Sequence, residues 1–71
     1  MNKQSFKVRT EFIDLLQLLK ATGYAATGGE AKMMVEDGLI SVNNELELRK
    51  RRKLRPGDEV QISDEIVIAL S

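Results

Sequence analysis

The spacing of apolar residues along the 71-residue chain changes from one predicted element to the next. Residues 5–9 alternate polar and apolar side chains, which predicts a short leading strand. The apolar side chains of residues 12–19 then recur at i, i+3, i+4 and i+7, the spacing of one buried helical face. We expect Thr10 to cap this helix and Gly23 to end it.

A second helix is predicted from the start signal at Thr27. Glu30 follows Thr27 by three residues, the spacing of a capping box in which each side chain accepts a backbone N–H of the other residue. We expect this helix to end at Asp37-Gly38. Because the connection over residues 23–26 is short, the two helices should pack side by side as a hairpin. The expected inward face of the second helix consists of Ala31, Met34 and Val35.

After Gly38 the apolar spacing changes to every second residue, which predicts strands. Asn43-Asn44 and residues 56–58 have the composition of tight turns between them. A leading strand, two helices and a run of strands predict one α+β domain over residues 1–71, with the helix hairpin packed on a small, mostly antiparallel sheet. The predicted strands after the second helix are 40–42, 46–48, 60–62 and 66–68.

Composition narrows the classes of function open to so short a chain. Cysteine and histidine are absent, which excludes disulfides, thiolate nucleophiles, imidazole bases and the usual zinc sites. A domain of this size buries only about 60% of its unfolded surface, which leaves little room for a deep active site. We therefore expect no enzyme activity, no cofactor and no metal. The sequence contains no membrane-spanning apolar run and no signal peptide, so we expect a cytoplasmic protein. We also expect a monomer.

Charge is unevenly distributed, although 11 basic and 11 acidic side chains give a net charge of zero. Residues 49–55 hold six of the basic side chains and no acidic one. A weaker basic area consists of Lys3, Lys7 and Arg9, with no acidic residue before Glu11. Because the local potential governs the approach of a polyanion, the neutral total does not exclude a nucleic acid.

The basic run should form an exposed loop. If the strand at 46–48 continued with its even residues facing inward, Lys50 and Arg52 would be buried, at a cost of several kcal/mol each. Arginine binds phosphate through paired hydrogen bonds, so the run favours phosphate contacts over a merely solubilising loop. We expect Glu45 and Glu47 to be solvated. The expected phosphate-binding residues are Arg49, Lys50, Arg51, Arg52 and Lys53.

The start of the second helix is a second candidate site. A helix N-terminus presents free backbone N–H groups and partial positive charge. Gly28 and Gly29 after the capping Thr27 leave those groups unobstructed, and Lys32 lies on the same face as Gly28. A plain helix cap is the other interpretation of the same residues.

Aromatic residues are few, which bears on the kind of RNA that would be bound. The spacing places Phe12 in the core, and Tyr24 is expected to pack over the helix hairpin rather than stack on a base. No aromatic platform for single strands is evident. The pattern favours structured RNA, recognised by shape and phosphate.

Taken in order, these segments resemble the S-four-type RNA-binding domain, also called the αL motif. The segments that carry the resemblance are Asp14–Lys20, the Gly23 stop, Thr27–Lys32, Gly38–Asn44 and Pro56–Val60. With its leading strand and basic run, the whole chain is similar to the small stand-alone bacterial members of the YbcJ type.

The resemblance covers about residues 12–62 and implies an αL-type helix hairpin that binds structured RNA, such as ribosomal or transfer RNA. By position it implicates Thr27, Gly28, Gly29, Lys32 and the basic connection. Many members have arginine at the position of Gly28 and a basic residue at that of Asp14. The run 49–53 is therefore expected to be the main anchor, with Lys7 and Arg9 extending the surface.

Two other classes of function fit parts of the sequence. The basic loop could bind an acidic protein partner. Residues 42–45 and 56–60 also occur in β-grasp sulfur carriers, but the carrier needs a C-terminal Gly-Gly, and this chain ends Ile68-Ala69-Leu70-Ser71. The expectation is therefore a non-catalytic RNA-binding protein whose partner is structured RNA, the ribosome or a ribosome precursor, with no membrane partner.

Overall fold

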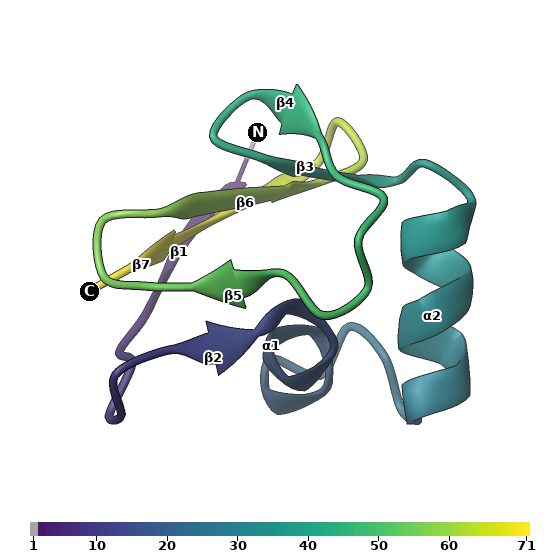
Figure 1. Cartoon of the computed structure of the whole chain (residues 1–71). Coiled ribbons are helices and arrows are strands. Elements are labelled where there is room, and N and C mark those ends of the chain that lie inside the picture. The colour runs from purple at the N-terminus through teal and green to yellow at the C-terminus, as the bar shows by residue number, and fades with distance from the viewer. Residues whose placement is uncertain (1) are drawn as a thin grey trace.

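In the computed structural model, which describes residues 2–71, a hairpin of two helices packs beside a five-stranded sheet (Figure 1). The helices are α1 (Leu15–Ala21) and α2 (Gly28–Glu36). The sheet has the order β1-β7-β6-β3-β4, and only the β1–β7 pair is parallel. The α+β prediction is therefore confirmed. The strands of this sheet are β1 (Asn2–Phe6), β3 (Ile40–Val42), β4 (Glu45–Leu46), β6 (Glu59–Ile62) and β7 (Ile66–Leu70).

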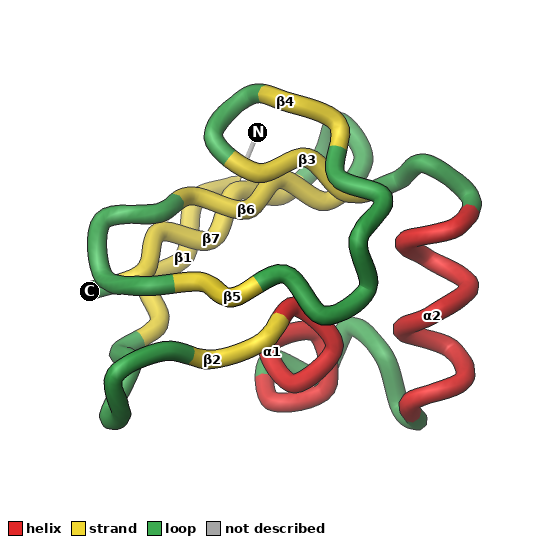
Figure 2. Tube along the Cα trace, in the orientation of Figure 1, coloured by secondary structure: helices red, strands yellow, loops and turns green. Residues whose placement is uncertain are grey.

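A separate two-stranded ribbon lies between the sheet and α1 (Figure 2). It consists of β2 (Ile13–Asp14) and β5 (Lys53–Leu54), paired antiparallel. The ribbon explains why α1 begins later than we expected. Asp14, rather than Thr10, is the N-cap, and its carboxylate accepts the Gln17 N–H at 2.8 Å. Thr10 instead donates its hydroxyl hydrogen to the Phe12 carbonyl at 2.7 Å.

The leading strand also differs from its predicted position at residues 5–9. Strand β1 pairs with β7 from Asn2↔Ile66 to Phe6↔Leu70. Backbone hydrogen bonds define this pairing, since most of the β1 side chains are exposed at the sheet edge and show no apolar alternation. Val8, beyond the strand, is buried instead.

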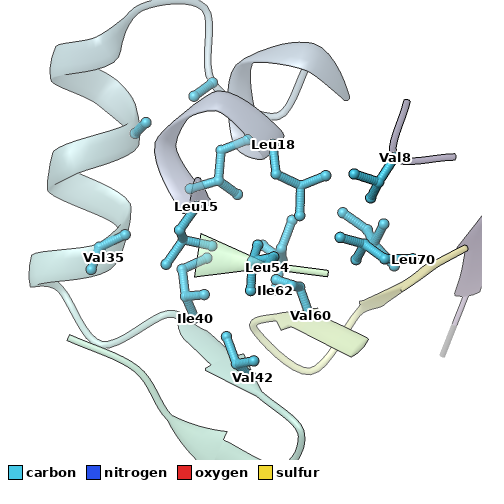
Figure 3. Close-up of a cluster of buried hydrophobic side chains, with 14 residues drawn as sticks. Val8, Leu15, Leu18, Val35, Ile40, Val42, Leu54, Val60, Ile62 and Leu70 are labelled. Carbon is cyan, nitrogen blue, oxygen red and sulfur yellow. The ribbon is translucent and has the colours of Figure 1, made fainter. Parts of the chain in front are cut away.

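The core lies between the helices and the inner face of the sheet (Figure 3). Leu15 and Leu18 of α1 and Leu54 of β5 are fully buried there. Helix α2 contributes Ala31 and Val35, as predicted, with Met34 half-buried beside them. Across residues 2–71, neither helix combines the length and the apolar content needed to cross a membrane.

The β3–β4 turn forms as predicted, with Asn43 and Asn44 at φ values of 52° and 70°. This two-residue turn pairs Val42 with Glu45 and Ser41 with Leu46. Because directly paired residues share a face and Val42 points into the core, the register sends Leu46 to the outer face. The prediction that Leu46 and Leu48 face inward is therefore wrong.

The exposed fractions follow that register. Leu46 is 60% and Leu48 58% exposed, whereas Glu47 between them is only 5% exposed. The prediction that Glu47 is a solvated residue is also wrong. Its burial determines the conformation of the basic segment that follows.

Candidate nucleic-acid interface

Residues 49–53, here called the basic loop, are organised around the buried Glu47 carboxylate. Arg49 donates to it from Nε at 2.9 Å and from Nη2 at 3.1 Å, and Arg52 donates from Nη1 at 2.6 Å. The Arg49 backbone N–H adds a bond at 3.0 Å. Hydrogen bonds from Arg49, joined by that from Arg52, outweigh the effect of burial and lower the pKa of Glu47 to about 2.

The ends of the loop are also fixed through the backbone. The Arg52 carbonyl accepts the Leu15 N–H at 2.9 Å, which joins the loop to the first residue of α1. Leu54 then enters the core. The basic loop thus begins at a buried ion pair and ends at a buried leucine, so its conformation is defined at both ends.

Two further carboxylates pair with the loop, one from α2 and one from the N-cap of α1. Lys50 Nζ lies 2.9 Å from a Glu36 oxygen at the end of α2, and this contact lowers the pKa of Glu36. Arg51 Nη1 lies 3.6 Å from a carboxylate oxygen of Asp14, while the Arg51 side chain stays 80% exposed. The Asp14 side chain is only 14% exposed and caps α1, so it stays in place, while the long contact leaves most of the Arg51 guanidinium open to phosphate.

The expectation that the loop cations stand unpaired in water is therefore wrong for four of the five side chains. We expected burial of Lys50 and Arg52 to be too costly, yet both are partly buried because Glu36 and Glu47 compensate their charge. The cations still outnumber the three carboxylates. An open depression collects four of them, Arg49, Arg51, Arg52 and Lys53.

The N-terminus of α2 has the predicted Thr27 cap but not the full capping box, since only the Thr27 half of the reciprocal pair forms. Thr27 Oγ1 accepts the Glu30 N–H at 3.1 Å, so the Thr27 side chain caps the first turn of the helix. A Cβ atom at Gly28 would meet no atom within 4 Å, and one at Gly29 would make only an ordinary contact with Thr27. The fold itself therefore does not require glycine at either position.

One face of α2 connects this helix end with the basic loop. Gly28, Lys32 and Glu36 follow one another at i, i+4 spacing, so they share a face. Lys32 contributes to the lowered pKa of Glu36, which Lys50 contacts directly. The loop therefore contacts the C-terminal end of α2, about 12 Å along the axis from the glycine pair.

Lys7 and Arg9 lie apart from the basic loop. Both are exposed, and they line a different depression, near the connection from β1 to β2, with Thr10 and Ile13. The structure thus brings the five loop residues together and leaves Lys7 and Arg9 in a second basic area.

Sequence reasoning missed Glu47, Phe12 and Arg55. The Phe12 side chain is 37% exposed rather than buried in the core. Lys53 Nζ and Arg55 Cζ lie 4.9 and 5.9 Å from the centre of its ring. For Glu47 the signal was present, because the two-residue turn fixes which residues face inward. Within residues 2–71, no cluster of three or more acidic side chains could hold a metal ion.

Comparison with known proteins agrees with this architecture. Residues 6–69 match the family model described as S4 domain. The chain is 33% identical over 51 residues to an Escherichia coli (strain K12) protein named "Putative RNA-binding protein YbcJ", covering 72% of this chain and 73% of that protein. It is 40% identical over 55 residues to "Probable ribosome maturation protein RlbA" of Bacillus subtilis (strain 168), covering 78% of each. A two-helix hairpin on a small sheet, a basic loop and these matches together show that the chain belongs to the S4 domain family.

Proposed function

We propose that this protein is a non-catalytic RNA-binding protein that binds structured RNA, either ribosomal or transfer RNA, through the basic loop and the N-terminus of α2. The observation that carries the proposal is the convergence of Arg49, Arg51, Arg52 and Lys53 on one open depression. Membership of the S4 domain family and the names of the two relatives support it.

The arginines of the basic loop have different roles in binding phosphate. Arg51 is 80% exposed and only loosely paired, so it is free to donate two parallel hydrogen bonds to a phosphate. Arg52 is 27% exposed and held by Glu47, so it mainly shapes the loop. Arg49 combines both roles, since its side chain bonds to Glu47 yet remains 73% exposed.

The second part of the interface is the first turn of α2. The amides of Gly28 and Gly29 offer donors that have no partner within the helix, and Lys32 adds positive charge on the same face. Thr27 holds this turn in place through its cap on Glu30. Lys7 and Arg9 extend the surface toward a more distant part of a large RNA.

Shape and phosphate recognition suit duplex or folded RNA, whose major groove is too narrow for side chains to read. Ribosomal and transfer RNA, the ribosome and its precursors are the partners proposed, bound by a monomer in the cytoplasm. Release of counterions from several phosphates would make the affinity strongly dependent on salt.

The experiment is a titration of folded RNA hairpins of several sequences with the wild type and an Arg51→Glu/Lys53→Glu variant. We expect the variant to lose affinity at least about tenfold on every sequence, because phosphate contacts are not sequence-specific. Lys3→Glu, on β1 at the other edge of the sheet, is the control for a charge reversal outside the basic loop.

Equal affinities for the wild type and the loop variant would contradict the assignment of the loop. Failure of the wild type to bind any folded RNA would contradict the proposed function. A pull-down repeated with nuclease distinguishes the remaining alternative, an acidic protein partner, since that complex would survive digestion of the RNA.

A further inference from the structure

Phe12 occupies an unusual position for one of two phenylalanines in a small domain. It precedes β2, where Ile13 pairs with the buried Leu54 of β5. Because neighbours along a strand point to opposite faces, Phe12 projects away from the core. The residue is 37% exposed at the surface of the molecule.

Two cations approach this exposed ring. Lys53 and Arg55 flank Leu54 on β5, so their side chains project to the same outer face as Phe12. Lys53 Nζ lies 4.9 Å and Arg55 Cζ 5.9 Å from the ring centre, both within cation–π distance. Lys53 also lines the depression of the basic loop, so the ring adjoins that surface.

An open depression of about 560 Å³ adjoins the ring. Neither Lys53 nor Arg55 lines it, so the ring meets the depression and the two cations on different sides. Gln17 Oε1 accepts the Asp14 N–H, which leaves the Gln17 amide N–H groups to donate. The depression is lined by Thr10, Phe12, Ile13, Gln17, Lys20 and Ala21.

We infer that Phe12 and this depression form a stacking site for one unpaired RNA base. This inference rests on the proposed function and adds an unpaired nucleotide to the features of the RNA that the protein recognises. A nucleotide combines a flat apolar face with an adjacent anion. Phe12, Ile13 and Ala21 match the base, Lys20 lies in the same depression, and Lys53 and Arg55 on the other side of the ring add positive charge for the neighbouring phosphates.

The charge distribution favours this occupant over an apolar ligand or a protein segment. Lys20 lines the depression, and an apolar partner bound there would remove water from its ammonium group, at a cost in free energy. Stacking of a base on an aromatic ring tolerates every base, so the site would select an unpaired nucleotide rather than a sequence.

The experiment compares two RNA hairpins that differ only in one bulged base. Wild-type protein should bind the bulged hairpin about tenfold more tightly than the fully paired one, a ratio typical of one stacked base. Phe12→Leu, which keeps an apolar side chain, should lose this preference and retain its affinity for the paired hairpin. Leu46→Ala, a change at a 60% exposed apolar residue of β4, should alter neither affinity.

A second variant gives a direct optical signal. The chain has no tryptophan, so with selective excitation the tryptophan fluorescence of F12W would come from position 12 alone, separate from the emission of Tyr24. The bulged hairpin should quench this fluorescence, whereas the paired hairpin should not. Binding of the bulged hairpin without quenching, or an unchanged preference in Phe12→Leu, would overturn the inference while the proposed function stands. If the wild type bound neither hairpin, both would fail.

Discussion

Strands β4 and β6 lie on either side of β3, yet they use opposite patterns of burial. In β6 the apolar residues Val60 and Ile62 face the core, as in an ordinary one-sided sheet. From β4 onward the apolar Leu46 and Leu48 face water and Glu47 is buried. The comparison teaches that a buried carboxylate is tolerated here because two guanidinium groups meet it, and that it organises the cations beside it.

The largest effect on stability should come from removing a buried leucine, and an exposed leucine near Glu47 provides the comparison. Leu54→Ala removes a fully buried side chain and should lower the free energy of unfolding by about 2–5 kcal/mol. Leu48→Ala removes a 58% exposed one and should change it by less than about 0.5 kcal/mol. Urea denaturation of both variants measures the difference, and similar losses would show that Leu48 is buried after all.

Glu47→Ala should have the next largest effect. It leaves Arg49 and Arg52 without their shared partner and should cost about 1–3 kcal/mol, less than for a fully buried pair, because Arg49 can turn to water. The loop should also lose its fixed shape, so RNA affinity should fall even though net positive charge rises. Glu45→Ala, at an exposed carboxylate of β4, is the matched control. Tighter RNA binding by Glu47→Ala would mean that charge alone matters.

The same ion pair predicts how stability depends on pH. The folded pKa of Glu47, about 2, lies below its ordinary value of 4.5. Its stabilising contribution, at most about 3 kcal/mol, is therefore complete above the ordinary value and is lost as the pH falls toward the folded value. Unfolding curves of the wild type and Glu47→Gln should converge over this range. Parallel curves between pH 5 and pH 2, to within error, would refute the assignment of the shift to Glu47.

The smallest effects on stability should come from two adjacent arginines, and the two losses should differ. Arg52→Gln removes a largely buried partner of Glu47 and should cost about 1 kcal/mol, whereas Arg51→Gln should cost less than about 0.5 kcal/mol. Thermal unfolding of the two variants under the same buffer conditions measures both. Equal losses would remove the distinction between a loop-shaping and a phosphate-binding arginine.

Local signals predicted much of the fold. The Thr27 cap, the Asn43-Asn44 turn and the alternation in β6 depend on neighbouring residues only, and each forms as expected. The inward position of Glu47 could also have been derived, because the two-residue turn that we predicted places it on the same face as Val42.

The remaining features depend on residues far apart in the sequence. The pairs Lys50–Glu36 and Arg51–Asp14 join the loop to α2 and to the N-cap of α1. The late start of α1 and the exposure of Phe12 depend on pairing between β2 and β5, and β1 depends on parallel pairing with β7. No periodicity within one segment encodes such contacts. Sequence reasoning could therefore name the basic residues but not which of them are free.

The measurement that tests the central claim most directly is the salt dependence of folded-RNA binding by the wild type, Arg51→Gln and Lys3→Gln. Removal of one side chain that binds a phosphate should reduce the slope of log affinity against log salt concentration by about 1. The account predicts a steep wild-type slope, a slope shallower by about 1 for Arg51→Gln, and an unchanged slope for Lys3→Gln. A flat wild-type slope, or equal slopes for Arg51→Gln and the wild type, would contradict it.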